Sequence, residues 1–347
     1  MGQSPDSSSY NNNCIGLPLV QGNADMCERI ATPQRYTSQP TKICEAGSII
    51  LSVRAPVGTV GKTFQKICLG RGVCGITSKN IEFMYQYLLN NENSWRHIEQ
   101  GGTFTAINSD DIKSFPIILP SLPEQKKIAD FLSFIDQRIE KQRQLVENLK
   151  KYKRGLLSAI FDRKLRFKDT DFSLWKNVRL SECCLGFDNK RQPISSELRE
   201  KGTVPYYGAN GIQDYVKDYI FDGEYILLAE DGGHFDEFQT KPIAQYITGK
   251  SWVNNHAHIL QATEKDCTKY IYYALVHKDI RKYINGSSRA KLNQEDMWQI
   301  VILLPNLKQQ IKIAQFMSSI DKILSIEEKM LTVLEEKKQG LLQQMFI

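Results

Sequence analysis

The sequence predicts an α+β protein with two tandem mixed α/β domains, separated by two long helices that pack as an antiparallel coiled coil. Three observations predict this fold: a long segment that occurs twice, heptads of apolar residues in both copies, and short strand patterns before each copy. We expect a first domain over 1–110 and a first helix region over 111–168. A second domain follows over 169–296 and a second helix region over 297–347.

The duplication is the strongest signal in the chain. The segment 115–161 returns as 300–346, at a constant offset and without a gap. Pro120 falls on Pro305, and Lys153 falls on Lys338. A constant offset over so many positions does not arise by chance, so we infer an internal repeat. The repeat predicts that the chain is built from two similar halves.

Each copy has the pattern of a short strand, a turn with proline, and a helix of about 38 residues, or about 57 Å at 1.5 Å per residue. Pro123 suits the first turn of the first helix, where its missing N–H is no loss. Polar Gln142 and Glu327 interrupt the apolar seam in the third heptad, which can fix the register and the partner of a coiled coil. The alternative is that each helix packs on its own domain or on other chains. The residues expected at the coiled-coil interface are Ile128, Leu132, Ile135, Ile139, Val146, Leu149 and Leu156 in the first copy, and Ile313, Met317, Ile320, Leu324, Leu331, Leu334 and Leu341 in the second.

The regions before the two helices have similar patterns. Strands are expected over 47–53 and 223–229, each entering a turn-rich loop, and helical spacing follows around 84–97 and 267–284. The two regions therefore predict divergent versions of one mixed α+β fold.

Composition and charge limit the function classes. Hydrophobic residues make up 41% of the 347 residues and charged residues 24%, which is typical of globular proteins. There is no run long and apolar enough to predict a membrane span. The eight cysteines form no Cys-x-x-Cys pair, which favours reduced thiols and a cytoplasmic location. The net charge of +6 permits nucleic-acid binding without demanding it, although 111–168 holds 14 Lys and Arg against 7 Asp and Glu.

The chain resembles the specificity subunit of type I restriction–modification systems. The motifs that carry the resemblance are PSLPEQKKIADFLSFID at the start of the repeated helix, GQSPDSSSYN, GLPLVQGNA and SVRAPVGTVG in the first half, and VPYYGANGIQDYVKDYIFDGEYILLAEDG and WVNNHAHIL in the second. Together they cover essentially the whole chain.

The resemblance implies a function in DNA recognition. Two target-recognition domains would each bind one half of a split DNA sequence. The two helices would hold them apart and bind two methyltransferase subunits, and a restriction subunit with motor and nuclease activity would join for cleavage. The second half carries a lead-in at 172–184 that the first half lacks at Met1, so we expect the first recognition domain either to be shortened or to take a strand from elsewhere.

Motifs for catalysis, cofactors and metals are missing from the sequence. No Asn-Pro-Pro-aromatic tetrapeptide of an adenine methyltransferase occurs, and Pro56 stands where a phosphate-binding loop before Lys62 needs glycine. His256 and His258 have no further ligands at metal-site spacing. Glu230 and Asp231 have no base or nucleophile spaced to work with them. We therefore expect no catalytic residue, no metal and no cofactor.

The candidate DNA contacts are loop residues of the types that bind base edges and phosphates. Each has a structural alternative, such as bracing a loop or filling the core. The candidates are Gln3, Ser4, Ser8, Tyr10, Arg54, Lys62 and Arg71 in the first half, and Lys190, Arg191, Tyr206, Tyr207, Asn210, Lys217, Asn254 and Asn255 in the second.

Two other functions stay open at this point. A specificity chain for a fused nuclease–methyltransferase would have the same sequence features. A coiled-coil assembly protein without DNA binding would differ by showing no salt-dependent duplex binding.

Overall fold

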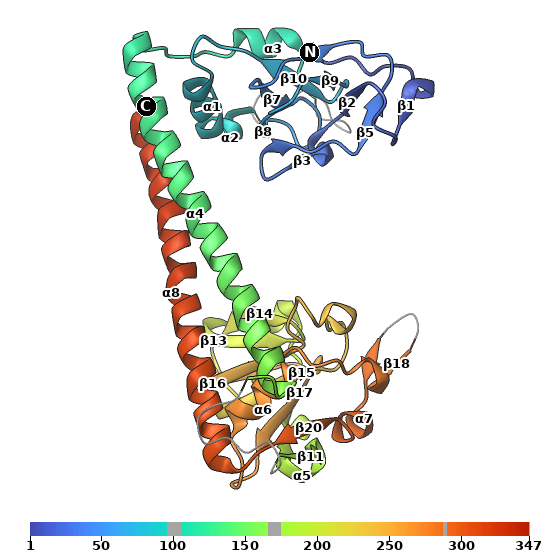
Figure 1. Ribbon diagram of the computed structural model, residues 1–347. Helices are drawn as coiled ribbons and strands as arrows, with labels where there is room; N and C mark the ends of the chain where they lie inside the picture. Colours follow the sequence, from blue (N-terminus) through green and yellow to red (C-terminus); the bar gives the residue numbers. More distant parts are fainter. Residues whose placement is uncertain (96–105, 166–174, 287–289, 347) are drawn as a thin grey trace. The chain divides into compact units, whose positions relative to one another are not determined.

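The computed structural model describes residues 1–347 except 96–105, 166–174, 287–289 and 347. The chain forms two compact units. Unit 1 comprises Met1–Arg143 and Lys329–Ile347, and unit 2 comprises Gln144–Glu328. The long helices α4 (Leu122–Phe161) and α8 (Leu307–Met345) each contribute a part to both units (Figure 1).

Unit 1 is built on two five-stranded sheets, in the orders β1–β5–β2–β9–β6 and β10–β7–β8–β4–β3. The strand expected over 47–53 is β7, which is buried along its whole length because apolar side chains occupy both faces. Helix α1 begins after Asn80, whose side chain accepts the backbone N–H of Phe83 as an N-cap. The strands are β1 (Tyr10–Asn11), β2 (Leu17–Val20), β3 (Met26–Cys27), β4 (Ile30–Ala31), β5 (Arg35–Thr37), β6 (Ile43–Cys44), β7 (Ile49–Ser52), β8 (Val60–Lys62), β9 (Ile67–Leu69) and β10 (Val73–Ile76), and the short helices are α1 (Ile81–Asn90), α2 (Glu92–Trp95) and α3 (Ser109–Ser114).

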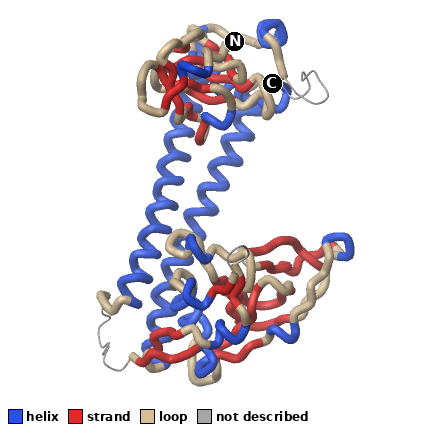
Figure 2. Tube along the Cα trace, turned by 90° about the vertical axis from the view of Figure 1, so that its right-hand side faces the viewer, coloured by secondary structure: helices blue, strands red, loops and turns tan. Residues whose placement is uncertain are grey.

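Unit 2 is built on one six-stranded sheet in the order β12–β17–β15–β16–β13–β14, with two small two-stranded sheets, β11–β20 and β18–β19. Figure 2 draws the strands of each unit in red and the helices in blue. The strand expected over 223–229 is part of β15, and the helical spacing around 267–284 gives the shorter helix α6. The strands are β11 (Lys176–Arg179), β12 (Cys184–Gly186), β13 (Lys201–Gly208), β14 (Gly211–Val216), β15 (Phe221–Ala229), β16 (Ala244–Val253), β17 (Ala257–Ala262), β18 (Ile284–Asn285), β19 (Lys291–Leu292) and β20 (Val301–Leu304), and the short helices are α5 (Leu180–Cys183), α6 (Thr268–Leu275) and α7 (Gln294–Trp298).

The backbone hydrogen bonds identify the matching positions of the two units. The N–H of Val53 donates to the carbonyl of Gly72, and the N–H of Glu230 donates to the carbonyl of His256, both at 2.9 Å. The carbonyl of Val53 accepts the N–H of Ile107, and that of Glu230 accepts the N–H of Leu292. The globular parts are therefore two versions of one fold, as the repeat predicts.

The two long helices start in the same register, since Leu122 and Leu307 are matching positions of the repeat. Within unit 1, Lys338 of α8 pairs with Asp136 of α4 at 2.5 Å, and within unit 2, Lys153 of α4 pairs with Asp321 of α8 at 2.5 Å. Early residues of one helix thus meet late residues of the other, so the pair is antiparallel. The predicted fold class is confirmed.

The seam residues differ in how deeply they are buried. Leu132, Ile139 and Val146 are buried on α4, and Ile313 and Met317 are buried on α8, where they join the core of unit 2. The alternative that the helices pack on their own domains therefore describes part of the structure. The remaining expected interface residues are half-buried: Ile128, Ile135, Leu149, Leu156, Ile320, Leu324, Leu331, Leu334 and Leu341.

Helices α4 and α8 have the length to cross a bilayer. Neither they nor any other helix in the described part of the chain carries an apolar stretch sufficient to do so.

One predicted strand is wrong. The segment before α8 forms β20, but the matching residues before α4, 115–119, form no strand. The strand β20 pairs with β11, which belongs to the lead-in of the second half. Among the described residues no segment pairs with 115–119, and Ile118 is left 72% exposed. A strand needs a partner for its backbone groups, which explains the difference.

Candidate nucleic-acid interface

A cleft of about 620 Å³ lies in unit 1, where the loops after β2 and β7 meet the segment before β10. Four of the residues predicted to contact DNA line it: Ser4, Tyr10, Arg54 and Arg71. The other lining residues are Pro5, Asp6, Ser7, Gln21, Gly22, Asn23, Ala55 and Gly72. The loops thus gather candidates that are far apart in the sequence.

The N-terminal segment is fixed along one side of this cleft. The N–H of Gln3 donates to the carbonyl of Leu69 at 2.9 Å, and the hydroxyl of Ser4 accepts the N–H of Arg71 at 3.2 Å. The Tyr10 hydroxyl donates to the carbonyl of Pro5 and accepts the amide of Gln21 at 2.8 Å. Tyr10 and Ser4 therefore hold the wall of the cleft.

Arg54 and Arg71 supply the positive charge of the cleft. Both side chains are exposed, and within the described residues neither forms an ion pair. The acid nearby is Asp6, whose pKa is lowered by hydrogen bonds from the side chain and the backbone N–H of Ser8. Ser8 is thus the partner of Asp6. Two arginines without ion pairs in a concave surface can bind base edges or phosphates.

Lys62 does not line this cleft. Its ammonium group pairs with Glu82 at 2.5 Å and lies 4.0 Å from the ring centroid of Tyr85. The Lys62 side chain therefore makes its contacts within unit 1. Its proposed contact with DNA stays a prediction.

In unit 2, several candidates hold the framework together. Tyr206 is 1% exposed, and its hydroxyl accepts the N–H of Ile194 at 3.1 Å. Asn254 is buried and donates to Gln213 at 3.1 Å. Arg191 donates to Glu230 at 2.5 Å and to the carbonyl of Ala257 at 3.0 Å. These side chains are better placed to shape loops than to touch DNA.

Other candidates of unit 2 lie at the surface. Asn255 is exposed, and Lys217 is exposed and pairs with Glu200 at 2.9 Å. Lys190 lies 5.2 Å from the ring centroid of Phe187. Tyr207 is half-buried, and this burial raises the pKa of its hydroxyl. Asn210 donates to the carbonyl of Gly232 at 2.8 Å.

The matching backbone positions show that the two units carry different chemistry. Asp231 follows Glu230 as Arg54 follows Val53, and each forms an isolated bridge, Arg54 with Ala106 and Asp231 with Lys291. Asp231 is held by His256, whose Nδ1 lies 2.6 Å from the carboxylate. The sequence analysis considered Asp231 and His256 only as catalytic or metal-binding residues and did not name them as candidate DNA contacts, because the match with Arg54 becomes visible only through the strand register.

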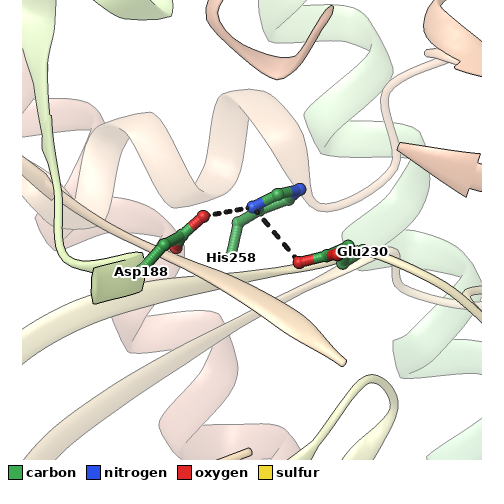
Figure 3. A group of neighbouring side chains, drawn as sticks. All are labelled: Asp188, Glu230 and His258. Atoms are coloured by element: carbon green, nitrogen blue, oxygen red, sulfur yellow. Dashed lines mark hydrogen bonds and ion pairs between the residues drawn. The ribbon is translucent and has the colours of Figure 1, made fainter. Parts of the chain in front are cut away.

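Behind this loop, a group of charged side chains fixes the ends of β15 and β17. Figure 3 shows Asp188, Glu230 and His258 facing one another. His258 is 1% exposed; its Nδ1 lies 2.5 Å from Asp188 and its Nε2 lies 2.8 Å from the carbonyl of Leu292. A carbonyl only accepts, so Nε2 carries a proton and offers no lone pair to a substrate.

The expectation that Glu230 and Asp231 lack a basic partner is wrong. Two histidines meet these carboxylates: His258 on β17 approaches Glu230 at 3.7 Å, and His256, in the turn just before β17, binds Asp231. The strand pairing of β15 with β17 brings them together, and sequence spacing does not reveal it.

Three potential metal ligands meet in this group, but their charges are already compensated. Glu230 pairs with Arg191 at 2.5 Å and with Lys291 at 3.1 Å. Asp188 pairs with His258 and lies 3.5 Å from Arg191. A divalent cation would have to displace these cations from both carboxylates. The arrangement is that of a structural charge network.

Comparison with known proteins identifies the family. The model of the type I restriction modification DNA specificity domain matches residues 4–150 and 173–336. The chain belongs to this family. The resemblance of the sequence motifs is thus confirmed.

The relatives support the same assignment. A Methanocaldococcus jannaschii protein, named for the MjaX type I restriction enzyme specificity subunit, is 39% identical over 172 residues, which are 48% of this chain and 40% of that one. A Haemophilus influenzae protein, also named as such a subunit, is 37% identical over 151 residues, 44% of this chain and 38% of that one. The chain therefore spans about two fifths of the length of these relatives.

The solved S subunit of a type I restriction–modification system from M. genitalium shares the fold. It covers 100% of this chain, and this chain covers 92% of it, with a TM-score of 0.63 at 19% identity.

Proposed function

We propose that the chain is the DNA sequence-recognition subunit of a type I restriction–modification complex. Each unit recognises one half of a bipartite target, and the paired helices set the spacing between the halves. The observation that carries the proposal is the duplicated backbone frame with unlike side chains at matching positions, Arg54 and Arg71 in one unit and Asp231 and Asn255 in the other. Two frames with different polar groups suit two different DNA words.

In unit 1, the cleft supports binding to guanine-containing DNA. Arginine donates two parallel hydrogen bonds to O6 and N7 of guanine, which is the commonest specific base contact. Arg54 and Arg71 line the cleft, and Asn23 offers an amide beside them. The fixed N-terminal segment keeps the cleft preorganised, which lowers the entropy lost on binding.

In unit 2, the matching loop supports a different base preference. A carboxylate accepts a hydrogen bond from the exocyclic amino group of cytosine. The Asp231 carboxylate is oriented by His256, and Asn210 fixes Gly232 in the same loop. Asn255 adds an exposed amide.

The long helices support a role in spacing and docking. A helix of 40 residues such as α4 spans about 60 Å at 1.5 Å per residue, close to two turns of B-DNA at about 34 Å each. Large apolar side chains stay exposed on both helices, among them Phe134 at 65% and Ile326 at 61%. Exposed apolar groups mark a protein-binding surface where they form a contiguous patch. We assign them to two DNA methyltransferase subunits, with restriction subunits completing the complex.

The test combines duplex binding with methylation mapping. We expect the purified chain to bind duplex DNA with an affinity that falls steeply with salt, because phosphate contacts release counterions. Neither methylation nor cleavage is expected from the chain alone with S-adenosylmethionine and Mg²⁺. An affinity for duplex DNA that does not change with salt concentration, or catalysis by the isolated chain, would overturn the proposal.

A further inference from the structure

The ion pairs between α4 and α8 fall into two classes when they are compared across the repeat. The constant offset between the two copies matches Asp136 with Asp321 and Lys153 with Lys338. The observed pairs are Lys153 with Asp321 and Lys338 with Asp136. Each copy therefore offers the same lysine and the same aspartate to the other. The same lysine–aspartate pairs could therefore also form between the α4 helices of two chains, or between their α8 helices.

The second class lacks this symmetry of charge. Arg143 pairs with Glu335 at 2.8 Å, and Lys150 pairs with Glu328 at 3.2 Å. Arg143 matches Glu328, and Lys150 matches Glu335. The two pairs thus occupy equivalent places in the repeat, but one copy holds both cations and the other holds both acids.

We propose that residues 143, 150, 328 and 335 form a charge code by which each long helix accepts the other helix of the same chain and rejects its own kind in a second chain. Exchange of helices between two chains would place α4 against α4 and α8 against α8. Arg143 would then face Lys150 of the other chain, and Glu328 would face Glu335. All four contacts would change from attraction to repulsion.

Neighbouring charges modulate the effect without cancelling it. On α4, Glu140 pairs with Arg143 at 3.1 Å and Glu147 with Lys150 at 3.3 Å, which would soften repulsion between two α4 helices. On α8, the residues three and four positions from Glu328 are uncharged: Leu324, Ser325, Leu331 and Thr332. Lys338 lies three positions from Glu335, so it would soften the repulsion between two α8 helices at that residue.

Charge-swap variants can change the contacts of the exchanged dimer while they keep the ion pairs within each chain. The double variant Lys150→Glu/Glu328→Lys keeps both attractive pairs within the chain and keeps the net charge. It also makes every contact attractive in the exchanged dimer. The variant Arg143→Glu/Glu335→Arg does the same at the other pair. Combining all four substitutions again keeps the internal pairs, but restores like charges in the exchanged dimer.

The test compares four full-length proteins: the parent, the two double variants and the quadruple variant. Each is unfolded and refolded at about 100 µM, and its oligomeric state is then measured by sedimentation. Four contacts change sign, and each exposed ion pair contributes a factor of about two, so both double variants should dimerise at least about 16-fold more strongly than the parent. The parent and the quadruple variant should behave alike. Double variants that dimerise no more than the parent, or a quadruple variant that dimerises as they do, would overturn the code.

Discussion

The most informative single substitution is Asp321→Ala, at the junction of α8 with the core of unit 2. The Asp321 carboxylate accepts the hydroxyl of Tyr273 at 2.5 Å and pairs with Lys153 at 2.5 Å. Tyr273 is 1% exposed and the Lys153 side chain 15% exposed, so the loss of Asp321 would leave Lys153 without this acid and the Tyr273 hydroxyl with only the longer contact of 3.4 Å to the Ser318 hydroxyl. A buried donor that loses its acceptor lowers the free energy of unfolding by about 1–3 kcal/mol. Because Asp321 itself is 32% exposed, we expect a total loss of about 2–3 kcal/mol.

The assay is urea denaturation of the full chain, with Glu335→Ala as the matched control. Glu335 also pairs across the helices, but its side chain is 47% exposed, so its removal should cost under about 1 kcal/mol. In a double-mutant cycle, Asp321→Ala and Tyr273→Phe should couple by about 1 kcal/mol or more. Equal losses for Asp321→Ala and Glu335→Ala would refute the reasoning.

Three further predictions concern recognition and acid stability. Arg54→Ala or Arg71→Ala should relax the preference at one position of one half-site by about 1–3 kcal/mol and leave the other half unchanged, as measured by binding to a library of duplexes; loss at both halves would argue against separate readers. Asp231→Asn should change only the half-site that Arg54→Ala leaves intact, and an unchanged preference would remove Asp231 from recognition. Burial is the largest single effect on the pKa values of Asp188 and Glu230, and it raises both. The hydrogen bond from His258 to Asp188 and that from Arg191 to Glu230, together with the neighbouring charges, outweigh burial, so both pKa values lie below the ordinary ones. Their stabilisation is therefore complete above about pH 5 and is lost as the pH falls through the lower folded values, and Asp188→Asn should flatten this acid limb in a pH series of thermal unfolding.

The helices were largely predictable from the sequence, because periodicity is local information. The constant offset of the repeat predicts that the helices start at equivalent positions, and Leu122 and Leu307 do so. The heptads, together with the domain between the two helices, predict the antiparallel pair. The burial of Ile313 and Met317 in the core of unit 2 was not predictable, because a heptad does not show which neighbour covers each seam position.

The loops were less predictable, because their contacts depend on strand register. Arg54 and Arg71 belong to different loops of the sequence and share a cleft. Arg191 has the composition expected of a phosphate contact, yet it is 16% exposed and bound to Glu230. The same residue type thus serves the framework in one unit and an open cleft in the other. The tertiary contacts distinguish these cases: Arg191 donates to Glu230 and to the carbonyl of Ala257, whereas Arg54 and Arg71 form no ion pair within the described residues.

The central claim is that two different readers on one repeated frame recognise a split DNA sequence. The most direct measurement is co-expression of the chain with its methyltransferase partner, followed by methylation mapping with long reads. The account predicts two short, unlike words separated by a fixed gap of several base pairs. A continuous motif, or two identical words, would contradict it.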